Sequence, residues 1–146
     1  MKTDCFDALR LLPVYALFLP IWLLAGGRKL LGPGVPQGFR DRFQDTVLAT
    51  FPGITVSFYQ IAVLEGIAAL IFAASLVRGE FRAGRERPLL HAGLWCSMLL
   101  FAMLAFGQRL SGDNDGAASL FFYFGATAAI ALYVQSADRP RVETGA

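Results

Sequence analysis

A single glutamate interrupts one of the most apolar stretches of this sequence. From Ile61 to Phe72 the chain reads IAVLEGIAALIF, and Glu65 is its only ionisable side chain. On a surface exposed to water this carboxylate would be unremarkable. Near the middle of a bilayer, however, placing a charged side chain costs on the order of 3 kcal/mol of insertion free energy. Glu65 is therefore a candidate for ion pairing or proton transfer. The alternative is a neutral or ion-paired glutamate that only locks helix packing.

Small residues surround Glu65 at helical spacing. They form a stripe of Ala62, Gly66, Ala69 and Ala73. Stripes of this kind mark where membrane helices approach closely, so the carboxylate is expected to face other helices rather than lipid. Gln60, more than one turn earlier, could extend a polar track from Glu65 toward the helix end.

Three further candidates gather at that same end of the predicted helices. Lys29 ends the first apolar block in LLAGGRKLLGP, whereas Arg109 ends the third in FGQRLSGDNDG and is followed by Asp113. Lys29, Arg109 and Asp113 could form either a polar plug or a pocket. His91 lies about 27 Å from Arg109 along a helix, so the two cannot share a site, and we interpret His91 as an interfacial histidine rather than a ligand.

The elements that carry these residues are predicted to be membrane-spanning helices. The 146-residue chain is 55% apolar and 16% charged, with a mean hydropathy of +0.52. Its long apolar blocks show no polar face, which a soluble bundle would require. We therefore expect an all-α integral membrane four-helix bundle in contact with the lipid bilayer. The predicted spans are about 8–27, 54–77, 89–107 and 117–134.

The first span is the ambiguous one, because Pro13 and Pro20 interrupt it and its length is close to that of a signal peptide. The preceding segment mixes acidic and basic residues, and no good small-x-small cleavage site follows the apolar run. We therefore expect an uncleaved helix, possible in a membrane because neighbouring helices can satisfy the backbone groups that proline frees.

The loop between the first two spans has its own pattern. Phe39, Phe43, Val47 and Phe51 recur every four residues between the turn signals GPGVP and Pro52-Gly53. This spacing predicts a short amphipathic helix over about 37–51, lying in the membrane interface or packed over the mouth of the bundle.

Four spans place both termini on one side of the membrane. That side carries eight basic residues: Lys2, Arg10, Arg78, Arg82, Arg85, Arg87, Arg139 and Arg141. The opposite side carries five: Arg28, Lys29, Arg40, Arg42 and Arg109. Because cytoplasmic loops are enriched in Lys and Arg, the asymmetry places both termini in the cytoplasm.

The sequence lacks the residue patterns that most cofactor sites and nucleic-acid sites require. Cys5 and Cys96 have no CxxC relation and are expected at different depths, so a disulfide between them is not expected. A single histidine cannot supply a bis-histidine haem site, and no zinc, nucleotide or nucleic-acid motif is present. An enzyme with its own cofactor is disfavoured unless that cofactor is lipid-soluble, such as a quinone.

The sequence resembles the DoxX-like family of small bacterial membrane proteins. The resemblance rests on four short spans, a first helix that ends in AGGRKLLGP, a proline-bearing amphipathic loop and a second helix with LEGIAALIF. It extends over roughly 11–134, and the ending GDNDGAASLFFYFG departs from the family pattern. Lys29 matches the family's lysine after the first span, and Glu65 matches the acidic residue of the second.

The resemblance implies a role in membrane redox assemblies, such as a thiosulfate and quinone oxidoreductase or an oxidative-stress complex. We therefore expect a non-catalytic accessory subunit of a redox or quinone-linked assembly in the inner membrane, with protein partners or further copies of itself. Alternatives are a small proton-linked transporter that uses Glu65, and a structural scaffold. Lys29 is expected to pair with Glu65, directly or through water and Gln60, because both charges are costly in apolar surroundings.

Overall fold

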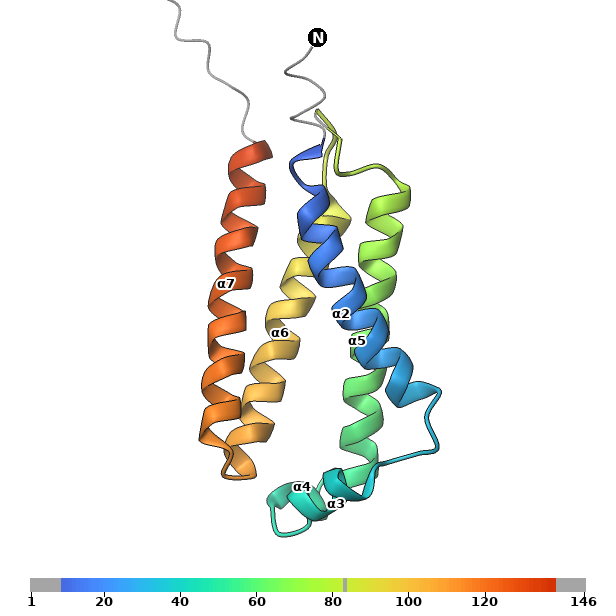
Figure 1. The fold of residues 1–146 in the computed structure, drawn as a ribbon, viewed down its shortest axis with the longest axis vertical. Coiled ribbons are helices and arrows are strands. Elements are labelled where there is room, and N and C mark those ends of the chain that lie inside the picture. The colour runs from blue at the N-terminus through green and yellow to red at the C-terminus, as the bar shows by residue number, and fades with distance from the viewer. Residues whose placement is uncertain (1–8, 83, 139–146) are drawn as a thin grey trace, which may run out of the picture.

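The computed structural model describes residues 9–82 and 84–138, and these residues form helices joined by turns. The helices are α2 (Leu12–Leu30), α3 (Gln37–Phe43), α4 (Val47–Thr50), α5 (Ile54–Val77), α6 (Pro88–Leu110) and α7 (Asn114–Asp138). The four long helices run side by side, with α3 and α4 lying at the end opposite the start of α2 and the end of α7 (Figure 1). The prediction of an all-α fold is confirmed for the described residues.

Three of the long helices have the length and composition to cross a membrane. They are α5, α6 and the Asn114–Ser136 part of α7. Large apolar side chains on them remain exposed, including Phe121 at 77% and Leu132 at 67%. This pattern supports a multi-pass membrane protein whose helices contact lipid. The fourth long helix, α2, contains two prolines and ends in Arg28 and Lys29, and it is not among these three.

The bounds of the long helices differ from the predicted ones mainly at their ends. The second span was predicted correctly at 54–77. Helix α2 continues through Pro20 to Leu30, three residues beyond the predicted end. Helices α6 and α7 extend beyond the predicted spans of 89–107 and 117–134 into polar sequence. The reason is that a terminal turn can be helical without being apolar. Cys5 and the basic residues Lys2, Arg139 and Arg141 lie outside the described residues.

The predicted continuous helix over 37–51 is wrong, since this segment forms two short helices. Thr46 interrupts it: both its backbone N–H and its hydroxyl donate to the carbonyl of Phe43, which closes α3. Phe39 and Phe43 lie on the same face of α3, with ring centroids 4.7 Å apart. Phe51, expected on the same face, is instead 79% exposed.

Aromatic side chains connect the long helices through the core. Phe18 of α2 stacks on Phe72 of α5, with ring centroids 5.3 Å apart, and Trp22 meets Phe101 of α6 at 5.0 Å. The Phe72 ring also lies against Gly93 of α6, where an added Cβ would be only 3.0 Å from the ring. These contacts hold α2 against both α5 and α6, so the position of the residues that end α2 is fixed by packing.

Candidate functional site

Helices α2 and α5 approach each other closely at Gly26. A Cβ placed there would lie 2.9 Å from the backbone nitrogen of Gly66 and 3.2 Å from the carbonyl oxygen of Ala62. Only glycine fits, because the obstructing atoms are backbone and cannot rotate away. The close approach brings the last turn of α2, which carries Lys29, onto the middle of α5.

Lys29 and Glu65 form a direct ion pair at this crossing. The Lys29 Nζ lies 2.5 Å from Glu65 Oε1. Glu65 is 1% exposed, and its second oxygen, Oε2, is buried and has no hydrogen-bond partner. The pairing predicted from the sequence is thus present, and it is direct rather than relayed through Gln60. It leaves half of the carboxylate unsatisfied.

The lysine side of the pair is open. The Lys29 side chain is 27% exposed and lines a cavity of about 710 Å³ formed with the loop after α2, from Gly32 to Gln37, and with Phe39 and Phe58. The ion pair therefore has a buried carboxylate and an ammonium group that borders a hollow at the α3 end of the molecule. A small ion or water entering this hollow would reach Lys29 before Glu65.

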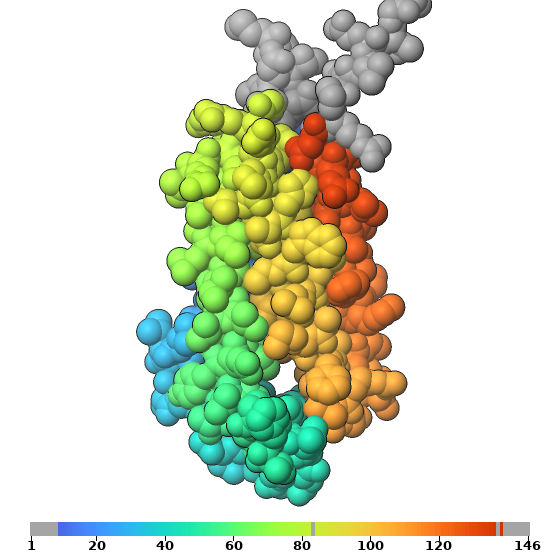
Figure 2. All heavy atoms as spheres, turned by 180° about the vertical axis from the view of Figure 1, so that it is seen from behind, coloured from blue at the N-terminus to red at the C-terminus, as the bar shows by residue number. Residues whose placement is uncertain are grey.

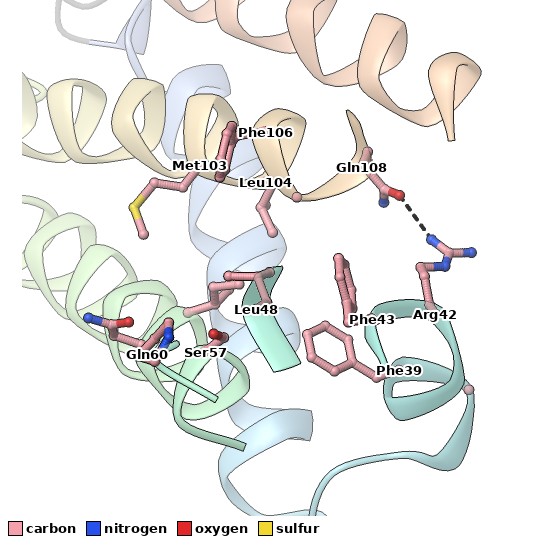
Figure 3. A pocket seen from close by; sticks show the side chains of 14 residues that line it. Phe39, Arg42, Phe43, Leu48, Ser57, Gln60, Met103, Leu104, Phe106 and Gln108 are labelled. Carbon is pink, nitrogen blue, oxygen red and sulfur yellow. Dashed lines mark hydrogen bonds between the residues drawn. The ribbon is translucent and has the colours of Figure 1, made fainter. Parts of the chain in front are cut away.

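A second pocket of about 510 Å³ lies between α3, α4, α5 and α6. Figure 3 shows Gln60 and Ser57 of α5 on one wall and Met103 and Leu104 of α6 on the other. From behind, the surface is hollowed at this level between the long helices and the short ones (Figure 2). Gln60 therefore belongs to this pocket and lies apart from the Lys29 and Glu65 contact.

The aromatic side chains of α3 lie between the two hollows. Phe39 lines both of them, and its ring contacts Phe43 on one side and Phe58 on the other, at centroid distances of 4.7 and 5.1 Å. Helix α3 therefore separates the two cavities, with Phe39 lining each of them. A movement of α3 would change both cavities together.

Arg109 and Asp113 lie at the turn between α6 and α7. Arg109 hydrogen-bonds to the Asn114 side chain, and Asp113 accepts a hydrogen bond from the backbone N–H of Gly116 at 2.8 Å. Asp113 also lies 3.5 Å from Arg42 of α3. Since Lys29 pairs elsewhere, the prediction that Lys29, Arg109 and Asp113 share one plug or pocket is wrong. The last two organise a turn, where capping rather than burial decides their contacts.

Sequence reasoning missed a buried polar network at the opposite end. Glu80, 4% exposed, accepts hydrogen bonds from Ser75 Oγ at 2.7 Å and from the backbone N–H groups of Leu89 and Leu90 at 3.3 and 2.8 Å. It therefore caps α6 from a distance of several residues in sequence. The signal was weak, because Glu80 stands among four arginines in a segment whose composition is typical of a solvated loop.

Arg87 joins this network to the end of α7. Its guanidinium, 3% exposed, donates to the backbone carbonyls of Glu80 and Arg82 and pairs with Asp138. His91 Nε2 lies 2.7 Å from the same aspartate. His91, interpreted from the sequence as an interfacial residue rather than a ligand, thus has a carboxylate partner on α7. These contacts bind three chain segments together.

Within residues 9–82 and 84–138, no three His, Cys, Asp or Glu side chains come close enough together to hold a metal ion. The candidate chemistry of the described chain is therefore that of an ion pair and two neighbouring hollows. No protein-family model, no curated protein and no solved structure matches this chain.

Proposed function

We propose that this protein is a four-span subunit of the bacterial inner membrane, similar to DoxX-like proteins, and that it assists a redox or quinone-linked assembly. The observation that carries the proposal is the Lys29 and Glu65 pair at the crossing of α2 and α5. These are the two positions at which the sequence resembles that family. A buried ionisable pair inside apolar helices is costly and is retained where it serves a site or a specific packing.

The proposal takes α2 as the first of four spans. Its outer face is apolar, since Leu23 and Leu24 are 58% and 62% exposed. The charge of Lys29 lies beside Glu65 rather than pointing outward, which lowers the cost of placing this turn near lipid. With four spans and the basic asymmetry of the loops, both termini lie in the cytoplasm.

A role as a subunit is supported by the surface of α7. Phe121, Phe122 and Leu132 are at least two-thirds exposed on this helix. Such a face suits lipid and a partner helix equally, and membrane helices pack on one another without a loss of hydrophobic contact. Small bundles of this kind gain stability when a larger assembly covers them.

The test is purification of the tagged full-length protein from its native membranes in mild detergent. Co-purifying proteins would be identified by mass spectrometry, and bound quinone and redox centres by extraction and difference spectroscopy. We expect a redox subunit to co-purify with the wild type and with Arg85→Met, an exposed control in the loop at the opposite end of the helices, but less with Lys29→Met. Purification with no redox partner and no quinone would contradict the proposal.

The unsatisfied oxygen of Glu65 favours one alternative, a small proton-linked transporter. A buried carboxylate with one free oxygen could take up and release a proton, and the hollow beside Lys29 offers a way in. In proteoliposomes this function predicts proton movement that Glu65→Gln abolishes. If there is neither proton movement nor a redox partner, the protein is a structural scaffold.

A further inference from the structure

The pocket between α3, α4, α5 and α6 has one buried polar group, the Ser57 hydroxyl, that makes no hydrogen bond within the described residues. Its volume of about 510 Å³ lies within the range of pockets that hold small molecules. Ser57 lines it and is 7% exposed, and its Oγ is buried without a hydrogen-bond partner. A buried hydroxyl left unpaired costs free energy, so a ligand oxygen that paired with it would gain that free energy back.

The walls of this pocket select an apolar molecule. Most of the lining is apolar, and it includes Phe39, Phe43, Leu48, Ile61, Met103 and Leu104. These side chains offer no hydrogen bonds, so most of any ligand must be hydrocarbon. Figure 3 shows Phe39, Phe43, Leu48, Met103 and Leu104 around the space, with Ser57 and Gln60 on the α5 wall. A ligand would therefore carry one polar end directed at α5.

The charges around the pocket indicate that this polar end is neutral. Among the described residues, Arg42 is the only charged one in the lining. Its guanidinium already lies 2.9 Å from Gln108 Oε1 and 3.5 Å from Asp113. An anionic head would have to displace these partners, and a cationic head would meet Arg42. Ser57 and Gln60 can both donate hydrogen bonds, and a carbonyl oxygen accepts them without carrying a charge.

We propose that this pocket binds a lipid-soluble molecule with a hydrocarbon chain and an uncharged carbonyl-bearing head, which accepts a hydrogen bond from Ser57. Quinones and acylglycerols both have this chemistry. The proposal rests on the membrane setting of the proposed function but not on any redox assembly. It also does not involve the Lys29 and Glu65 pair, which lies on the other side of Phe39.

The experiment uses the full-length protein in lipid nanodiscs with two photoreactive probes, an azido-decylquinone and a diazirine-bearing diacylglycerol. After illumination, labelled residues are mapped by mass spectrometry, and apparent affinity is taken from the concentration dependence of labelling. We expect labels on pocket residues such as Met103 and Phe43 from one probe or both. Labelling by one probe identifies the source of the carbonyl, and labelling by neither overturns the proposal.

Three variants separate the pocket from non-specific partition into lipid. Ser57→Ala should weaken labelling about threefold to tenfold, as expected for one hydrogen bond, without lowering thermal stability because its Oγ has no partner to lose. Leu104→Trp should fill the space and abolish labelling. Ser119→Ala, on the exposed surface of α7, should leave it unchanged. Equal labelling of wild type and Leu104→Trp would overturn the proposal.

The two proposals can fail separately. Pocket labelling in nanodiscs, together with no redox partner from native membranes, would retain the ligand site and contradict the assembly role. A redox partner without pocket labelling would do the reverse.

Discussion

Two buried glutamates lie in different parts of this molecule, and their surroundings are opposite in kind. Glu80 has hydrogen bonds to both oxygens, from Ser75 and from two backbone N–H groups. Glu65 has one oxygen on Lys29 and the other buried without a partner. Both side chains are almost inaccessible, at 4% and 1% exposure. Burial alone therefore does not distinguish a structural carboxylate from a candidate functional one.

The two carboxylates differ in what their hydrogen bonds do for the helices that carry them. Glu80 supplies the cap that α6 otherwise lacks, since the preceding residue, Arg87, makes no side-chain cap. Both of its oxygens are hydrogen-bonded to nearby groups, which is typical of a carboxylate with a structural role. Glu65 adds no cap and interrupts an apolar helix, so its half-satisfied state needs another explanation. Its single partner, Lys29, borders an open hollow.

The largest effect on stability is expected from removing Glu80, because both of its carboxylate oxygens accept hydrogen bonds. Glu80→Ala would leave Ser75 and two backbone N–H groups of α6 unpaired, so we expect a loss of about 2–4 kcal/mol of stability. Thermal unfolding in detergent measures it. Glu86→Ala, in the same loop but exposed, is the matched control and should change little. Equal losses would mean that Glu80 is not the cap.

A smaller loss is expected at the ion pair, because Glu65 can take up a proton when its partner is removed. Lys29→Met should cost about 1–3 kcal/mol, less than a fully buried pair, because the Lys29 side chain is partly exposed. Glu65→Gln together with Lys29→Met should recover part of that loss. Thermal unfolding of both single variants and the double variant forms the cycle. Strictly additive losses would show that the two residues do not interact.

The close approach of α2 and α5 gives the next test. Gly26→Ala would place a methyl group against the backbone of α5, force the helices apart and cost about 1–3 kcal/mol. It should also weaken the Lys29 contact, so Gly26→Ala and Lys29→Met should be less than additive. Gly27→Ala meets no atom within 4 Å and is the control. A silent Gly26→Ala would indicate that the crossing is wider than described.

The sequence predicted the parts of this structure that depend on local pattern. Continuous apolar runs predicted the long helices, and the small-residue stripe around Glu65 predicted that its carboxylate faces a neighbouring helix. It could not predict contacts between distant segments. The cap from Glu80 to α6 spans nine and ten residues and leaves no periodic signal. Likewise, the four-residue spacing of aromatics before Phe51 could not show that Thr46 would close α3.

Pockets were harder still to predict. Gln60 was expected to extend a track from Glu65, yet it lines a separate pocket with residues of α6. Two residues before Gln60, Phe58 packs on Phe39 of α3, and no sequence period predicts that contact between distant segments. Arg109 and Asp113 were grouped with Lys29 because they share an end of the bundle. Residues at the same end of the bundle lie at a similar depth, but this does not determine which side chains contact one another.

A third carboxylate, Asp113, gives the smallest expected effect and sharpens the comparison. It combines a cap, through the N–H of Gly116, with a charge 3.5 Å from Arg42, and both side chains of that ion pair are substantially exposed. Asp113→Asn keeps the capping oxygen and removes only the charge, so it should cost less than about 0.5 kcal/mol, because exposed ion pairs contribute little. Asp113→Ala also removes the cap and should cost about 1 kcal/mol. Thermal unfolding at low and high salt separates the two contributions, since only the charge is screened. If Asp113→Asn proved as costly as Asp113→Ala, the charge rather than the cap would hold this turn, and Asp113 would then resemble Glu65 rather than Glu80.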